Sequence, residues 1–185
     1  GLGQLMYKQW AKGIIYLLCQ VAFLAYFVLK GASDFIGFFT LGTTESNAWV
    51  GIEGDNSVIM MLMGLLSIVA IIFYIVIYIA NIKDCYSIQC SVDTLKEPKP
   101  FKKEVGALLN QKFYKTALAL PIVGVCVFSI LPIVFMIIIA FTNYGGDIVP
   151  PKLIDWVGLD NFARILTLGQ FAPTFFKIFG WNILW

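Results

Sequence analysis

The sequence predicts an all-α, polytopic helical membrane protein with three complete transmembrane helices and the start of a fourth. Two observations carry this prediction. The 185 residues are 59% hydrophobic and only 13% charged, whereas soluble domains average roughly 45–50% apolar and about 25% charged residues. Three uncharged apolar runs are also long enough to cross a hydrocarbon core of about 30 Å, which takes roughly 20 helical residues.

The first run, residues 13–29, is the shortest of the three and is flanked by Lys12 and Lys30. A secretory signal peptide is the alternative for this run, because lysines precede it and small residues follow it. Its length, the lysine after it and the presence of further spans favour a retained transmembrane helix. The second and third runs, residues 58–82 and 116–141, contain no charged residue and are long enough to span with some tilt.

A fourth apolar stretch begins near Phe175 and runs to the last residue of the sequence. The predicted fourth span is therefore truncated, and the sequence opens with Gly1 rather than methionine. We expect the chain to be the N-terminal fragment of a longer protein.

The distribution of lysines between the runs predicts the orientation in the membrane. Residues 83–115 contain seven lysines and four acidic residues, whereas residues 30–57 contain one lysine and four acidic residues. Because Lys and Arg are retained on the cytoplasmic side, we expect a multi-pass protein of the cell membrane with a cytoplasmic N-terminus. Residues 30–57 would then be an outer loop, irregular because of their many glycines, and residues 83–115 a charged inner linker near lipid headgroups.

The composition excludes several kinds of chemistry. With no histidine, the chain cannot form a Ser-His triad or a His-ligated zinc site. Cys85 and Cys90 are an isolated pair with four residues between them, so we assign no metal site. No glycine-rich phosphate-binding motif is present, and the net charge of +2 is too small for nucleic-acid binding. We therefore assign no catalytic, cofactor-binding or metal-binding residue.

Pro121 and Pro132 are the candidate kink positions of the third run. They are eleven residues apart, which places both on one face of a helix. Each removes one backbone hydrogen bond, so the helix is expected to bend near Pro132. A bent helix that lines or gates a path and a simple packing accommodation both explain these prolines.

The segment after the third run contains an expected short helix at residues 160–168. Asp160 is placed to cap its N-terminus, and Phe162, Ile165 and Leu166 share one face. Such a helix suits the outer membrane surface. An ordinary elbow between two spans is the alternative.

At these residues the sequence resembles the membrane-spanning permease subunits of binding-protein-dependent ABC sugar importers, of the maltose and maltodextrin type. The resemblance covers about 70 residues, from Thr116 to the end, and the hairpin before them also fits the maltose type. It divides the chain into an N-terminal transmembrane hairpin with its cytoplasmic loop, residues 1–115, and the start of the permease core, residues 116–185. The motif residues are Phe141, Thr142, Asn143, Gly158, Leu159, Asp160, Asn161 and Phe162.

The resemblance implies a non-enzymatic subunit that moves an oligosaccharide across the membrane. Its implied partners are a second permease subunit, an extracellular solute-binding protein, membrane lipid, and cytoplasmic ATPase subunits that would bind ATP and Mg. The family's cytoplasmic Glu-Ala-Ala loop has no counterpart here, and residues 145–178 are too few for a large outer domain. No sugar-contacting residue can be carried over. A four-span sensor or assembly module without a transport path is the alternative.

Overall fold

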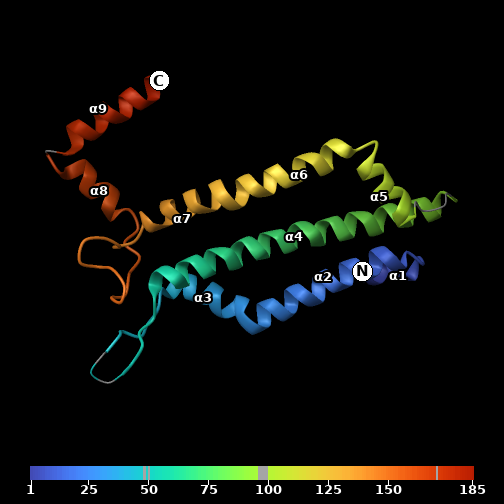
Figure 1. The fold of residues 1–185 in the computed structure, drawn as a ribbon, viewed down its shortest axis with the longest axis horizontal. Coiled ribbons are helices and arrows are strands. Elements are labelled where there is room, and N and C mark those ends of the chain that lie inside the picture. Colours follow the sequence, from blue (N-terminus) through green and yellow to red (C-terminus); the bar gives the residue numbers. More distant parts are fainter. Residues whose placement is uncertain (48, 50, 96–99, 170) are drawn as a thin grey trace. The chain divides into compact units, whose positions relative to one another are not determined.

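The structure is a computed structural model that describes residues 1–47, 49, 51–95, 100–169 and 171–185. Helices form most of the described residues, which contain no named strand and three isolated β-bridges. The helices, shown in Figure 1, are α1 (Leu2–Met6), α2 (Trp10–Tyr26), α3 (Ala32–Thr40), α4 (Ser57–Asp93), α5 (Phe101–Leu109), α6 (Phe113–Val125), α7 (Leu131–Ile139), α8 (Asp160–Thr167) and α9 (Phe171–Leu184), with π-helical segments η1 (Phe27–Gly31) and η2 (Cys126–Ile130).

Three helical stretches are long and apolar enough to cross a membrane. They are Trp10–Thr40, Ser57–Asp93 and Phe113–Ile139. Each contains or nearly matches one uncharged run of the sequence, and the described residues contain no sheet. The predicted all-α membrane class with three spans is therefore confirmed.

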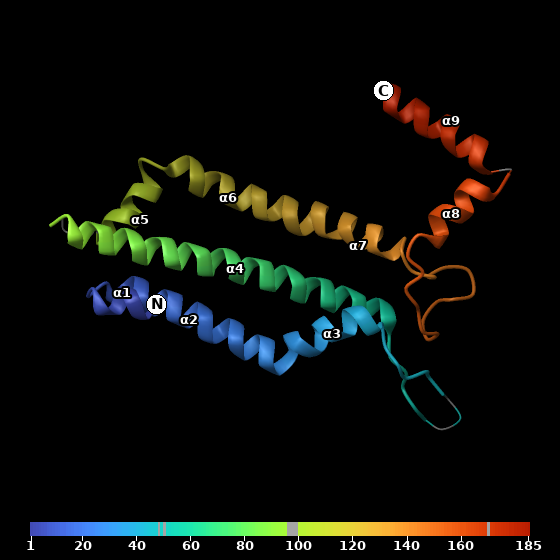
Figure 2. The same cartoon turned by 180° about the vertical axis from the view of Figure 1, so that it is seen from behind.

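The first helical stretch is longer than the sequence predicts, because it continues past Lys30 to Thr40. Residues 32–40 are α3 and not part of an irregular loop. The π-helical segment η1 joins α2 to α3, and the chain changes direction there in both views (Figures 1 and 2). A π-helical turn leaves backbone groups without their usual α-helical partners, and here the carbonyl of Gly31 accepts a hydrogen bond from Ser67 Oγ at 2.8 Å.

The chain forms two compact units. One contains residues 1–39 and 61–130, and the other contains residues 40–60 and 131–185. The sequence-based division between residues 115 and 116 stays a prediction.

In the first unit, α2 and α3 pack antiparallel to α4. The rings of Phe23 and Tyr74 stack with their centroids 4.0 Å apart, and Ser67 reaches the carbonyl of Gly31 further along. Next to this contact the two backbones come close at Gly64, where an added Cβ would lie 2.8 Å from the carbonyl oxygen of Asp34. Small residues at helix interfaces allow such an approach inside membranes.

We expect Gly64→Val to destabilise this helical hairpin by about 1–3 kcal/mol, the usual range for overpacking. The added side chain would collide with Phe38 and with the backbone of α3. Thermal unfolding of the purified full-length protein measures the effect. Gly106→Val is a size-matched control, because nothing lies within 4 Å of the corresponding Cβ position. Equal shifts for the two variants would contradict the close contact.

In the second unit, residues 41–47 and 51–56 form a folded loop lobe with residues 142–159. Leu41 and Ile154 are each only 1% exposed, and Ser57 Oγ accepts a hydrogen bond from the backbone N–H of Ile154 at 3.1 Å. The carboxylate of Asp55 accepts hydrogen bonds from the backbone N–H groups of Thr43 and Thr44, at 2.9 and 3.0 Å. The lobe is therefore held by specific contacts despite its glycine-rich sequence.

The Asp55 contact predicts a pH dependence. The N–H groups of Thr43 and Thr44 stabilise the ionised carboxylate and hold the pKa of Asp55 below its usual range. A lowered pKa contributes stability above the unfolded pKa of about 3.9, which is lost as the pH falls through the folded value. We expect amide hydrogen exchange at residues 41–47 to accelerate only below about pH 4. Asp55→Asn should remove this acid step, whereas Glu53→Gln should leave it unchanged.

Candidate functional site: the junction after the third span

The predicted motif residues come together where the third helical stretch ends. Beyond Ile139 the chain leaves the helix, and the buried hydroxyl of Thr142 donates to the carbonyl of Ile139 at 2.8 Å. The last carbonyl groups of any helix lack partners within it. Thr142 therefore satisfies one of these groups from the residue that turns the chain.

A returning segment, residues 155–158, pairs with residues 141–143. The N–H of Asn143 donates to the carbonyl of Asp155 at 3.0 Å, and the Asn143 side-chain oxygen accepts from the N–H of Asp155 at 2.8 Å. The carbonyl of Phe141 accepts from Val157 and Gly158, at 2.9 and 3.1 Å. Gly158 has a φ of 59°, a left-handed conformation that glycine adopts without steric cost.

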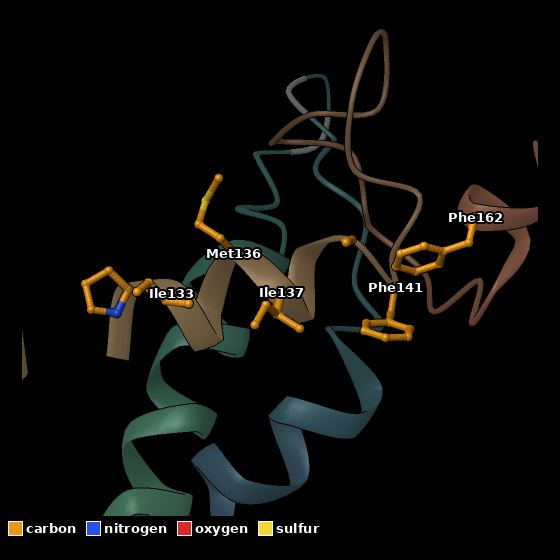
Figure 3. A pocket seen from close by; sticks show the side chains of 7 residues that line it. Ile133, Met136, Ile137, Phe141 and Phe162 are labelled. Atoms are coloured by element: carbon orange, nitrogen blue, oxygen red, sulfur yellow. The ribbon is translucent and has the colours of Figure 1, made fainter. Parts of the chain in front are cut away.

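Asn161, in the first turn of α8, holds this helix at the junction by hydrogen bonds. Its side-chain amide donates to the carbonyl of Ala140 at 2.9 Å and to the carbonyl of Thr142 at 2.7 Å. The rings of Phe141 and Phe162 lie beside each other, with centroids 5.3 Å apart (Figure 3). Both donor hydrogens of one amide thus bridge two carbonyl groups near the end of the span.

The structure corrects the predicted role of Asp160. The N-cap of α8 is Leu159, no side chain caps the helix, and Asp160 is the first helical residue. Its negative charge still lies in the first turn, where the helix dipole favours it. The helix itself, Asp160–Thr167, lies within the predicted range, and its position on a membrane surface stays a prediction.

An apolar groove lies beside this junction in the same unit. Its volume is about 520 Å³, and its walls are α7 and the two phenylalanines (Figure 3). All of its lining side chains are apolar. The lining residues are Pro132, Ile133, Met136, Ile137, Ala140, Phe141 and Phe162.

The two prolines of the third stretch have different surroundings. Pro121 lies inside α6, and Pro132 is the second residue of α7, directly after η2. A proline ring clashes with the carbonyl four residues earlier and leaves that carbonyl without its donor. For Pro132 this carbonyl belongs to Phe128 in η2, and a wider π-helical turn gives the ring room. The role of either proline in gating stays a prediction.

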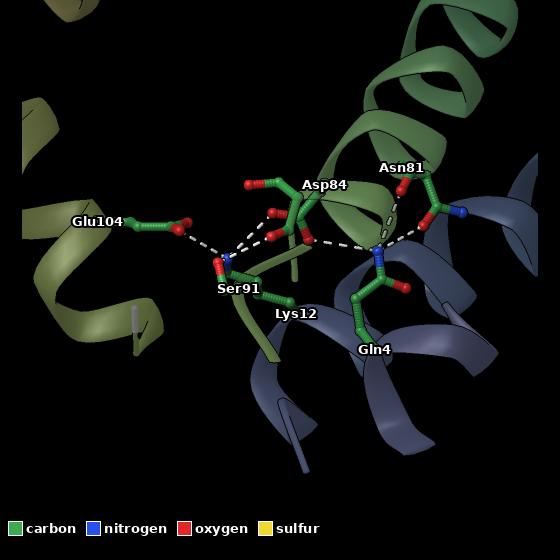
Figure 4. A network of polar contacts seen from close by, with 7 residues as sticks. Gln4, Lys12, Asn81, Asp84, Ser91 and Glu104 are labelled. Carbon is green, nitrogen blue, oxygen red and sulfur yellow. Dashed lines mark hydrogen bonds and ion pairs between the residues drawn. The ribbon is translucent and has the colours of Figure 1, made fainter. Parts of the chain in front are cut away.

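A polar network in the first unit was not predicted from the sequence. Lys12, whose side chain is only 6% exposed, makes ion pairs with Asp84 Oδ1 at 3.0 Å and Glu104 Oε1 at 2.7 Å (Figure 4). Gln4 is fully buried, and its Nε2 lies 2.8 Å from Asn81 Oδ1 and 3.3 Å from Asp84 Oδ2. The network joins α1, α2, α4 and α5.

One signal for this network was present in the sequence. Lys12 and Asp84 each lie just outside an apolar run, at ends that an antiparallel hairpin brings together. A lysine and an aspartate at two helix ends that lie side by side predict an ion pair between them. Nothing comparable places Glu104, which lies in the linker after α4.

The described residues contain no group of three His, Cys, Asp or Glu side chains that could hold a metal ion. Cys19, Cys85, Cys90 and Cys126 are all free thiols.

The fold and these helix-joining sites define a multi-pass helical membrane protein, and the comparisons specify which kind. The chain is 32% identical over its whole length to the maltodextrin transport system permease protein MalC of Streptococcus pneumoniae, covering 41% of that protein. It is 33% identical to the galactooligosaccharides transport system permease protein GanP of Bacillus subtilis, covering 43% of it, and 29% identical to the maltodextrin permease protein MdxF of that organism, covering 41%.

The chain therefore matches the N-terminal portion of sugar transport permeases, and the resemblance seen in the sequence is confirmed. It spans about two fifths of the length of these relatives. Their role as transport permeases fits a non-enzymatic protein. No protein-family model matches the chain. No solved structure matches it.

Proposed function

We propose that the full-length protein is a membrane-spanning subunit of an ATP-driven importer that moves an oligosaccharide, of the maltodextrin or galactooligosaccharide class, across the cell membrane. The observation that carries this proposal is the match to permease proteins of such transport systems along the entire chain. Three helical stretches that are long and apolar enough to cross a membrane agree with it. The alternative of a sensor or assembly module is not favoured by these relatives.

In this proposal the chain supplies transmembrane helices, and its partners hydrolyse ATP and bind the sugar outside the cell. A second permease subunit would complete the path, and an extracellular solute-binding protein would deliver the sugar. As the family resemblance implies, ATP and Mg would be bound by separate ATPase subunits on the cytoplasmic side. The lysines of residues 83–115 support a cytoplasmic N-terminus.

Uptake of labelled sugars tests the function. Deleting the gene should abolish uptake of labelled maltotriose or of a galactooligosaccharide, and the full-length gene supplied in trans should restore it. Unchanged uptake of both sugars in the deletion strain would contradict the proposal. Uptake of glucose is the control for general energy failure.

Cysteine labelling in whole cells tests the orientation. In a full-length protein without native cysteines, Glu53→Cys should react with a membrane-impermeant maleimide added outside, and Lys103→Cys should react only after the cells are opened. Both positions are exposed. Reaction of both from the same side would contradict the orientation.

The candidate kink makes a prediction about rate. If Pro132 bends or gates the third span, Pro132→Ala should restore a backbone hydrogen bond and change the initial uptake rate severalfold, with unchanged amounts of protein in the membrane. Pro173→Ala, at an exposed residue in the first turn of α9, is the control. Normal uptake by Pro132→Ala would favour the packing alternative.

A further inference from the structure

We propose that Lys12, Asp84 and Glu104 form a clasp with one fixed arm and one releasable arm. The fixed arm is the pair Lys12–Asp84, and the releasable arm is the pair Lys12–Glu104. In its closed state the clasp holds α5 against the hairpin of α2 and α4, and release of Glu104 frees α5. Its use in transport rests on the proposed function, whereas the clasp itself rests on the contacts below.

The fixed arm is built into the hairpin. Lys12 and Asp84 have side chains only 6% and 19% exposed, and their charged atoms are 3.0 Å apart. The second carboxylate oxygen of Asp84 accepts from Gln4, which is itself fully buried and bonded to Asn81. Separating Lys12 from Asp84 would leave buried charges without partners, which is strongly unfavourable. This arm therefore stays closed.

The releasable arm has the opposite character. The Glu104 side chain is 41% exposed, and Lys12 is its partner at 2.7 Å. When Glu104 leaves, its carboxylate enters water, and Lys12 keeps Asp84 as its counter-ion. Opening this arm therefore creates no unpaired buried charge, and its cost resembles that of a partly exposed ion pair. Because Lys12 stays paired with Asp84, the release of Glu104 has a small free-energy cost.

The backbone of α5 permits such a movement. The helix has only nine residues and no buried one. An extended Pro100 precedes it, and a turn at residues 110–112 follows it. Short helices bounded by irregular residues at both ends can turn as rigid pieces. Glu104 is thus the charged group through which this helix is joined to the buried network.

A movement of α5 would reach the third span. The two helices are separated by only a short turn, and Thr116 Oγ1 of α6 donates to the carbonyl of Leu108 in α5 at 3.1 Å. The third stretch has no buried side chain in its most apolar part. The clasp therefore sets how firmly the start of this span is tied to the hairpin.

Distance measurements between α4 and α5 test the proposal. Spin labels are placed at Gln89 and Lys103, both exposed, in the full-length protein without native cysteines, in membranes, and their distance distribution is recorded by double electron–electron resonance. We expect a major short and a minor long distance. Glu104→Gln should raise the ratio of long to short about fivefold.

Asp93→Asn is the matched control, because it removes one exposed carboxylate near the end of α4 that makes no ion pair with any described residue. It should leave the distribution unchanged. A single distance that Glu104→Gln does not alter would overturn the releasable arm, as would equal effects of the two variants. This measurement needs no transport partner, so its failure is distinguishable from a failure of the uptake assay.

Discussion

Replacing Lys12 by methionine is expected to lower the free energy of unfolding by about 3 kcal/mol, the low end for breaking a buried ion pair from one side. Methionine fills much of the same volume but cannot compensate Asp84, whose side chain is 19% exposed, or satisfy Glu104. The low end of the range applies because both carboxylates can turn partly toward water. Denaturant titration of the purified full-length protein, followed by tryptophan fluorescence, measures the loss.

Two further variants separate the buried pair from charge in general. Lys83→Met removes an exposed lysine beside Asp84 that makes no ion pair with any described residue, so we expect a change within about 0.5 kcal/mol. The double variant Lys12→Met with Asp84→Leu should regain most of the loss, because apolar replacement of a buried pair is often neutral or stabilising. A double variant as unstable as the sum of its single changes would contradict this account.

The membrane spans could be predicted because their signal is local. An uncharged run of sufficient length is itself the physical requirement for crossing a hydrocarbon core. The extension of the first helix past Lys30 could not be predicted in this way. It depends on a pairing between Gly31 and Ser67 of another helix, and on a close approach of α3 to Gly64. The glycine content of residues 30–57 alone therefore predicts a loop where the structure has α3.

At the junction after the third span, too, the sequence predicts some features and not others. The motif residues come from the resemblance to sugar permeases, and the structure brings them together at the end of the third span, while their role stays a prediction. Their bonds were not foreseen, since the acceptors of Asn161 are main-chain carbonyl groups about twenty residues earlier. The prediction that Asp160 caps α8 is wrong, because side-chain type indicates a cap but not the residue at which the helix begins.

Asn161→Asp is expected to detach α8 from the end of the third span. The change is nearly isosteric, yet an ionised carboxylate cannot donate to the carbonyl groups of Ala140 and Thr142, and its negative charge faces both oxygens. Losing both hydrogen bonds should cost about 2 kcal/mol in local stability. Amide hydrogen exchange of the full-length protein should show faster exchange at Val157 and Gly158, whose N–H groups pair with Phe141 in the same junction.

The pH dependence of amide protection in this variant distinguishes the loss of the two hydrogen bonds from general misfolding. Two facing carbonyl oxygens disfavour the charged form, so the pKa of the introduced carboxyl group should be raised in the folded state. A raised carboxyl pKa contributes stability below the unfolded pKa of about 3.9, which is lost as the pH rises through the folded value. Protection at Val157 should therefore recover partly near pH 4 and be lost at pH 7. Asn110→Asp, at an exposed residue outside the junction, should show no such recovery, and a pH-independent loss for Asn161→Asp would contradict the two-carbonyl contact.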